Sequence, residues 1–167
     1  QTGLSQHCWG RAQGWYTMAL IELLDVLPSD YARRGEVIDL LRKDLEAIVK
    51  WQDKESGMWY QVMDAPQKEA NYLESTCSSM FAYALLKAYR KGYVGTPYRE
   101  AGIKAYRGII NNFIRIDNDL SLSLTHCCSV AGLGPDNNRR RNGTFEYYLS
   151  EPQRDNDAKG IGPFIWA

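Results

Sequence analysis

Apolar residues recur at the spacing of amphipathic α-helices in two long stretches of the first third of the chain. One stretch runs from about Gln13 to Leu27 and the other from Arg33 to Gln52. Pro28 separates them, because a proline interrupts a helical pattern. Asp53-Lys54-Glu55-Ser56-Gly57 then turns the chain into a short extended stretch, Met58–Val62. The apolar faces are expected at Trp15, Met18, Ala19, Leu23 and Val26 in the first helix, and at Val37, Leu40, Leu41, Leu45, Ile48, Val49 and Trp51 in the second.

This order of two helices and an extended stretch repeats further along the chain. Met18 and Met80 are separated by the same number of residues as the leucine pairs Leu23-Leu24 and Leu85-Leu86. A repeating unit of two helices predicts stacked helical hairpins, in which Leu24 and Leu86 occupy matching buried positions. The second unit is expected to comprise helices over Glu74–Gly92 and Tyr98–Ile116 and an extended stretch over Leu120–Leu124, and a third unit to open at 162–167 after an insertion over 129–143.

The composition fits one sizeable hydrophobic core. The chain has 167 residues, of which 44% are hydrophobic, and this is too short for two comfortable domains. It begins without an initiator Met and ends in an apolar run, Phe164–Ala167, that resembles the start of a helix. We therefore expect residues 1–167 to form a single partial domain that is truncated at both ends.

The charge and hydropathy patterns favour neither nucleic acid nor membrane as a partner. Twenty basic residues balance twenty acidic ones. No stretch approaches the roughly 20 apolar residues of a membrane span. The run Arg139-Arg140-Arg141 lies between Gly134-Pro135-Asp136-Asn137-Asn138 and Asn142-Gly143, which favours a solvated loop over a polyanion site. Gly132-Leu133-Gly134 is not followed by the Lys-Ser or Lys-Thr of a nucleotide-binding loop.

The cysteines give no sign of a disulfide framework or a metal site. Cys127 and Cys128 are adjacent, and neighbouring cysteines rarely bridge each other, so all four cysteines are expected to be buried or free thiols. His7-Cys8 and His126-Cys127-Cys128 lack the Cys-x-x-Cys or His-x-x-x-His spacing of a zinc site. We therefore expect no metal site at these residues.

The most informative stretch is Trp9-Gly10-Arg11-Ala12-Gln13-Gly14-Trp15, which leads directly into the first apolar helix. In a helix, Arg11 and Trp15 are four residues apart and project from one face. The guanidinium can bind a carboxylate through two parallel hydrogen bonds, and the indole can lie against a pyranose ring. This pair suits an anionic sugar. The alternative is core packing with a snorkelling cation, which is the more common role of such a pair.

Three motifs in order resemble family 105 glycoside hydrolases, the unsaturated rhamnogalacturonyl hydrolases. They are the stretch Trp9–Trp15, the stretch Tyr72-Leu73-Glu74-Ser75, and the segment Tyr147–Pro152 with its continuation Asn156–Phe164. The resemblance covers nearly the whole chain. The resemblance implies an all-α fold, an (α/α)6 barrel of six helical hairpins, of which this chain would be the C-terminal portion. The helices that begin near Trp9, Glu74 and Asp157 would be inner helices, and their N-terminal ends would surround the pocket.

The resemblance also implies a reaction and a set of site residues. These enzymes act on unsaturated galacturonyl-rhamnose oligosaccharides from pectin by hydrating the C4–C5 double bond of the uronide, which implies no metal and no organic cofactor. Arg11 and Trp15 match the substrate-binding arginine and tryptophan of the family, and Trp9 and His7 flank them. The proton donor of the family is an aspartate upstream of this stretch, so no Asp of this chain is expected to take its role. The alternatives are an unsaturated glucuronyl hydrolase acting on glycosaminoglycan-derived disaccharides and a noncatalytic sugar-binding helical module.

Four further polar residues have both a structural and a functional interpretation. Glu74 and Asp157 precede helices, where a carboxylate complements the helix dipole, but at a pocket rim they could also contact substrate hydroxyls. Lys159 lies on the same predicted rim. His126 lies near the end of the second extended stretch and is more often a loop histidine than a catalytic one.

Overall fold

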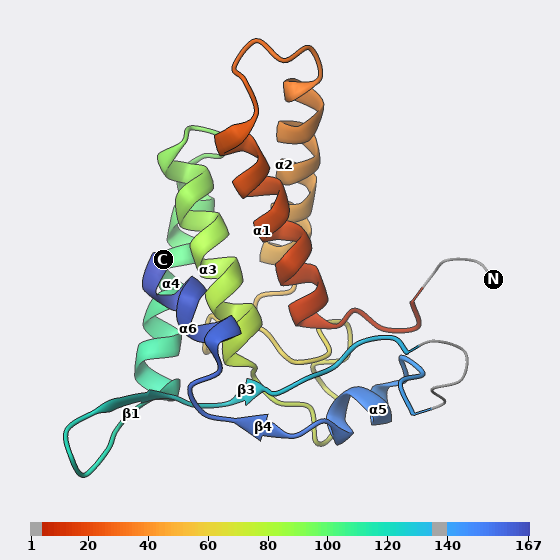
Figure 1. The fold of residues 1–167 in the computed structure, drawn as a ribbon, viewed down its shortest axis with the longest axis vertical. Helices are drawn as coiled ribbons and strands as arrows, with labels where there is room; N and C mark the ends of the chain where they lie inside the picture. Colours follow the sequence, from red (N-terminus) through yellow and green to blue (C-terminus); the bar gives the residue numbers. More distant parts are fainter. Residues whose placement is uncertain (1–4, 135–139) are drawn as a thin grey trace.

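The computed structural model describes residues 5–134 and 140–167. Two helical hairpins stand side by side: α1 (Gly10–Val26) with α2 (Arg34–Lys50), and α3 (Ser75–Arg90) with α4 (Thr96–Phe113). The shorter α6 (Ala158–Trp166) packs on α3. Helices α1, α3 and α6 all start from the same end of the molecule, where the loops and short strands gather (Figure 1). The predicted pair of successive helical hairpins is confirmed.

Short strands and one short helix form the base from which these helices start. β1 (Ile114–Ile116) pairs antiparallel with β2 (Leu122–Leu124), and β3 (Cys127–Cys128) pairs antiparallel with β4 (Gln153–Arg154). The remaining element is α5 (Phe145–Ser150), which the periodicity of the sequence did not predict.

One predicted helix end and one predicted extended stretch differ from the structure. The helix expected to reach Ile116 ends at Phe113, because 114–116 leave the helix to pair with β2. The stretch Met58–Val62 forms isolated bridges to Leu73 and to Trp9 instead of a strand. In both places the backbone conformation depends on pairing with a segment elsewhere in the chain. The periodicity of apolar residues does not predict such pairing.

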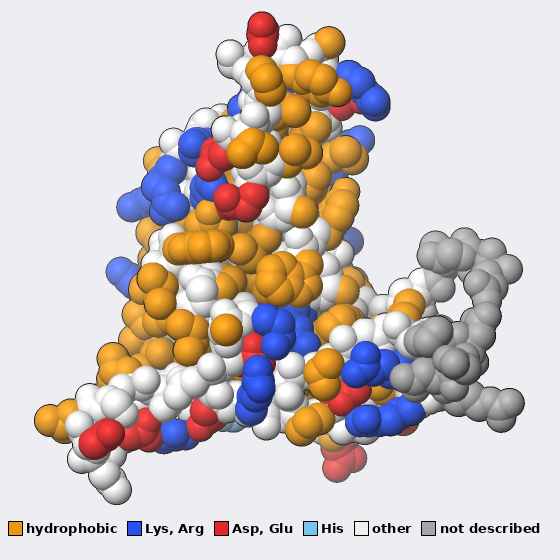
Figure 2. Space-filling model, viewed as in Figure 1, with side chains coloured by type: hydrophobic (Ala, Val, Ile, Leu, Met, Phe, Trp, Pro, Cys, Tyr) orange, Lys and Arg blue, Asp and Glu red, His pale blue; other side chains and the backbone are white. Residues whose placement is uncertain are grey.

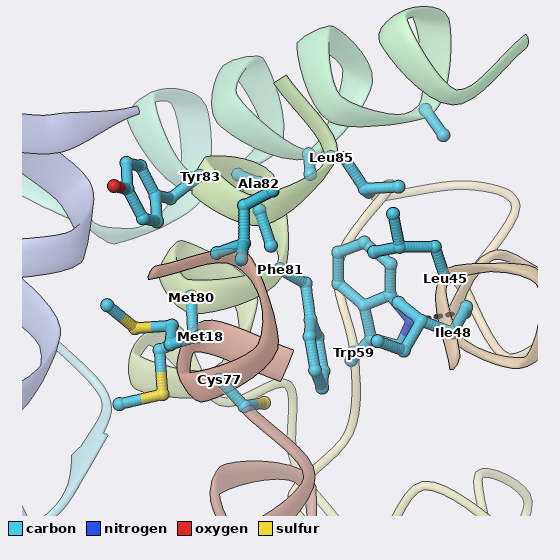
Figure 3. Packing of buried hydrophobic residues seen from close by; sticks show 14 of the residues in the cluster. Met18, Leu45, Ile48, Trp59, Cys77, Met80, Phe81, Ala82, Tyr83 and Leu85 are labelled. Atoms are coloured by element: carbon cyan, nitrogen blue, oxygen red, sulfur yellow. Dashed lines mark hydrogen bonds between the residues drawn. The ribbon is translucent and has the colours of Figure 1, made fainter. Parts of the chain in front are cut away.

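Helix α3 lies at the centre of the hydrophobic core. Almost all of its residues are buried, and α1, α4 and α6 all pack against it. Figure 3 shows Phe81 of α3 facing Trp59, with ring centroids 5.0 Å apart in an edge-to-face arrangement. The Trp59 indole also donates a 2.8 Å hydrogen bond to the Ile48 carbonyl, which ties this loop residue to α2.

Small residues set the distance between α1 and α3. A Cβ added at Gly10 would lie 2.8 Å from the Cys77 sulfur, and one at Gly14 would lie 2.6 Å from the Met80 sulfur. Both distances are shorter than real Cβ contacts allow, so the two glycines let α1 approach α3 closely. The glycines of the stretch Trp9–Trp15 therefore have a packing role, and they fix where Arg11 lies.

The predicted apolar faces of the first two helices are only partly right. Leu23 and Val26 are exposed on α1, and so are Leu40 on α2 and Trp51 at the C-cap of α2. The reason on α1 is that the side facing α3 begins with glycines, which hydrophobic periodicity does not mark. Figure 2 shows hydrophobic side chains at the surface over α1. The residues of α1 that are buried are Gly10, Arg11, Gly14, Thr17, Met18, Leu20, Ile21 and Leu24.

The expected match between Leu24 and Leu86 is also wrong. Leu24 is 2% exposed, but Leu86 is only half-buried, and its neighbour Leu85 is the residue with no exposed surface.

We expect Leu24→Ala and Leu85→Ala each to lower the free energy of unfolding by about 2–5 kcal/mol, because each leaves a cavity in the core. Denaturant unfolding checks this. Leu86→Ala is the control and should have a smaller effect; three equal losses would contradict this account of the core.

Candidate functional site

Arg11 lies in the first turn of α1 and is buried, with 2% of its surface exposed. Its Nη1 donates a hydrogen bond to the carbonyl oxygen of Cys128. Its guanidinium carbon lies over the ring of Trp9, 5.0 Å from the ring centroid. The helical spacing predicted the indole of Trp15 beside the guanidinium. The indole that lies there is instead that of Trp9. Trp15 leaves 47% of its surface exposed.

The charge of Arg11 has no direct counter-ion in the described part of the chain. Within residues 5–134 and 140–167, no carboxylate lies within ion-pair distance of its guanidinium. A buried cation without a partner is destabilising, because it loses its hydration and gains no opposite charge. An anionic group that reached the guanidinium would supply that charge. The site is thus suited to a carboxylate ligand, which binds an arginine through paired hydrogen bonds.

Trp9 is held in place by a buried glutamine and a tyrosine. Its indole Nε1 donates a 3.2 Å hydrogen bond to Gln61 Oε1, and its ring stacks on Tyr148 with centroids 5.6 Å apart. Gln61 has no exposed surface, and its Nε2 donates to the Tyr148 carbonyl at 3.3 Å. These contacts fix the orientation of the indole relative to Arg11. No pattern in the sequence indicates this role of Gln61, because Gln61 lies 52 residues from Trp9.

His7 and Trp9 line an open groove of about 670 Å³ next to the N-terminal end of α1. His7 Nδ1 lies 3.2 Å from Asp64 Oδ2, and the backbone N–H of Cys8 donates to Asp64 Oδ1 at 2.9 Å. Two of the four predicted binding residues therefore share this groove, whereas Arg11 and Trp15 do not line it. The other polar and aromatic groups on its walls include Gln13, Asp64 and Tyr148.

The cysteine in this groove is not an activated nucleophile. Burial, with a smaller contribution from the nearby Asp64 carboxylate, raises the pKa of the Cys8 thiol to about 11. A thiol with such a pKa stays protonated near neutral pH, and the thiolate is the reactive form. Cys8, Cys77, Cys127 and Cys128 are all free thiols, as predicted.

Glu74 and Asp157 are N-caps, as the structural interpretation predicted. Glu74 caps α3 by accepting a 2.6 Å hydrogen bond from the N–H of Cys77, and Asp157 caps α6 by accepting one of 2.9 Å from the N–H of Lys159. The Asp157 carboxylate also pairs with the Lys159 ammonium at 2.7 Å and with Arg154 at 2.6 Å. Burial raises the pKa of the Asp157 carboxyl, but the hydrogen bonds from Lys159 and Arg154 outweigh burial and hold this pKa below its usual range. Figure 2 shows Lys and Arg side chains near the N-terminal ends of α1 and α6.

His126 lies in the loop before β3, away from the groove of His7. Its backbone has a positive φ of 60°, its ring stacks on Phe113, and its Nδ1 lies 2.8 Å from Thr125 Oγ1. It is therefore a loop histidine in this structure. In the arginine run, Arg140 is exposed and pairs with Glu151 at 3.1 Å, and Arg139 lies outside the described residues.

The sequence profile described as Glycosyl Hydrolase Family 88 matches the chain from residue 1 to residue 167. The chain belongs to this family. It is similar to a solved family 105 glycoside hydrolase of C. acetobutylicum ATCC 824, with a TM-score of 0.93 and 46% identity over 99% of this chain and 46% of that one. Protein Atu3128 of Agrobacterium fabrum is 38% identical over 170 residues, which are 99% of this chain and 72% of that protein. The unsaturated rhamnogalacturonyl hydrolase YesR of Bacillus subtilis is 32% identical over 105 residues, which are 63% of this chain and 28% of that enzyme.

These similarities confirm the resemblance to families 105 and 88 and the class of enzyme, a glycoside hydrolase. They also confirm the fold class: the helical hairpins of this family 88 chain are part of an (α/α)6 barrel. The chain spans about half the length of the solved family 105 relative and about three-quarters of that of Atu3128. The three helices expected to be inner, α1, α3 and α6, start where the sequence predicted. Their N-cap residues are Trp9, Glu74 and Asp157.

Two further observations concern partners and ligands. Among the helices of the described residues, none combines the length and the apolar character needed to cross a membrane. In residues 5–134 and 140–167, no three His, Cys, Asp or Glu side chains gather in a way that could hold a metal ion.

Proposed function

We propose that the protein carrying this chain hydrolyses unsaturated galacturonyl-rhamnose oligosaccharides derived from pectin. The observation that carries the proposal is Arg11, a buried guanidinium with no direct carboxylate partner in the described residues, next to an indole and close to an open groove. The name of YesR, an unsaturated rhamnogalacturonyl hydrolase, supports the choice of substrate.

In the proposed reaction, an acid protonates C4 of the enol-ether double bond of the terminal uronide. Water then adds at C5, and the resulting hemiketal collapses and releases the neighbouring sugar. Arg11 holds the conjugated carboxylate and stabilises the charge that shifts as the double bond is protonated. The acid is an aspartate that we expect outside residues 1–167. The reaction replaces the direct displacement by paired carboxylates that most glycosidases use.

The remaining site residues have binding roles in this proposal. Trp9 is held against Arg11 and shapes the subsite of the uronide ring, while the exposed Trp15 offers its indole face to a sugar. His7, at the groove wall, contacts a hydroxyl of the uronide or of the adjoining sugar. The groove of about 670 Å³ has room for a small oligosaccharide.

Turnover of two substrates tests the proposal in the active protein that carries this chain. We expect loss of the ultraviolet absorbance of the conjugated double bond with unsaturated galacturonyl-rhamnose, and little or none with an unsaturated chondroitin disaccharide. The reverse preference would make the protein an unsaturated glucuronyl hydrolase. Binding of both sugars without any loss of absorbance would make it a noncatalytic sugar-binding module and overturn the proposal.

A further inference from the structure

We propose that Glu74 is a positioning residue for Arg11, acting through the backbone of Cys128. The inference rests on the proposed function, because it assigns to Glu74 a part in holding the arginine that would bind the uronide carboxylate. It joins three elements that are far apart in the sequence: α1, the start of α3, and β3. Glu74 itself need not touch the substrate.

The two oxygens of the Glu74 carboxylate make different contacts. One accepts the capping hydrogen bond from the N–H of Cys77 at 2.6 Å, and the other accepts a 2.8 Å hydrogen bond from the N–H of Cys128. The carbonyl of Cys128 in turn accepts the hydrogen bond from Arg11. A single residue of β3 therefore connects a buried carboxylate to a buried guanidinium.

The register of the β3–β4 pair explains why Cys128 is available for both contacts. In an antiparallel pair, backbone groups of successive residues point to alternate edges of the strand. Ser129 donates its N–H to Pro152 at 2.8 Å, and Cys127 is paired with Arg154, so these neighbours face β4. The N–H and carbonyl of Cys128 face the opposite edge. There Glu74 satisfies the N–H and Arg11 satisfies the carbonyl, so the two side chains together fix the edge of β3.

The charges of Glu74 and Arg11 support each other without direct contact. Glu74 has no exposed surface, and no Lys or Arg of residues 5–134 and 140–167 lies within ion-pair distance of it. Opposite charges attract strongly in a poorly solvated interior, which offsets part of the unfavourable burial of both ions. Because the contact runs through Cys128, Glu74 occupies none of the N–H donors of Arg11. In the proposal, those other donors pair with the ligand carboxylate.

A capping role alone does not account for a glutamate at this position. The favoured N-cap residues are Ser, Thr, Asp and Asn, whose short side chains reach the first turn of the helix. Asp157 of α6 follows that rule. Glutamate has one more methylene group, and at position 74 this length lets the carboxylate reach Cys128 while it caps α3.

Glu74→Asp separates the two roles, because aspartate keeps the charge and the cap but is too short to keep both contacts. The affinities of the active protein for galacturonate and for its neutral amide are measured by competition with substrate, and thermal unfolding is followed in parallel. We expect Glu74→Asp to bind galacturonate roughly 2- to 150-fold more weakly, the range of coupling between residues of one hydrogen-bond network. Affinity for the amide should be unchanged, so the preference for the carboxylate falls by the same factor.

Asp157→Asn is the matched control, since it removes the charge of a buried N-cap on the neighbouring helix α6. It should lower the unfolding temperature and leave the preference for the carboxylate as in the wild type. Glu74→Gln, which keeps the length and removes the charge, provides the second variant. The inference is overturned if both Glu74 variants keep the wild-type preference, if they lose both ligands equally, or if neither folds. A wild type without any preference for the carboxylate would instead overturn the proposed function, and the inference with it.

Discussion

Arg11→Lys is expected to lower kcat/KM for the unsaturated uronide roughly 10- to 150-fold, the effect of losing a hydrogen bond to a charged group. Lysine keeps the positive charge but cannot form the two parallel hydrogen bonds of a guanidinium with a carboxylate. The side chain also lies against the indole of Trp9, and an ammonium group would not stack there in the same way. Steady-state kinetics with the active protein measures this effect.

A substrate whose carboxylate is replaced by a neutral amide decides whether Arg11 binds the carboxylate. With the amide, the wild type should lose most of its advantage over Arg11→Lys. The control is Arg34→Lys, because within the described residues the guanidinium of Arg34 donates to the carbonyls of Leu24 and Leu27 and to the hydroxyl of Tyr93, which are structural contacts. It should reduce stability and leave the ratio of the two substrates unchanged. An Arg11→Lys protein that loses the same factor on both substrates, or that unfolds, would show that Arg11 is a structural residue.

Residues 1–167 on their own are expected to show no hydrolase activity. The chain corresponds to 46% of the solved family 105 relative. In the proposed reaction, we expect the proton donor outside residues 1–167. A reaction that starts by protonating C4 cannot proceed without that acid, however well the uronide is held. The measurement is the ultraviolet absorbance of an unsaturated galacturonyl-rhamnose substrate after addition of the purified polypeptide. A protein of the full length of the family 105 relative is the positive control.

Measurable turnover by residues 1–167 would place the acid within this chain. Asp64 would then be the first candidate, because its carboxylate lines the groove and lies 3.2 Å from His7 Nδ1. Asp64→Asn should then abolish the turnover. Asp157→Asn is the control and should not, because the Asp157 carboxylate is paired with Lys159 and Arg154.

The sequence by itself determined the hairpin order, the family and the starts of the helices that carry the site. These are local properties. The apolar periodicity of α1 to α4 predicts helices, and the carboxylates Glu74 and Asp157 mark N-caps because a cap contacts N–H groups only two or three residues away. The three motifs, Trp9–Trp15, Tyr72–Ser75 and Tyr147–Pro152 with its continuation, likewise indicated the family from their order along the chain.

Only the tertiary structure decided which groups surround Arg11. Its acceptor, Cys128, lies 117 residues away, and the aspartate that contacts His7 lies 57 residues away. Helical spacing placed Trp15 beside Arg11, yet the indole in contact is that of Trp9, which precedes the helix and is oriented by Gln61. Gly10 and Gly14 bring α1 close to α3, so Arg11 is buried and meets β3. Periodicity along one helix cannot predict this, because it depends on how closely separate elements approach one another in three dimensions.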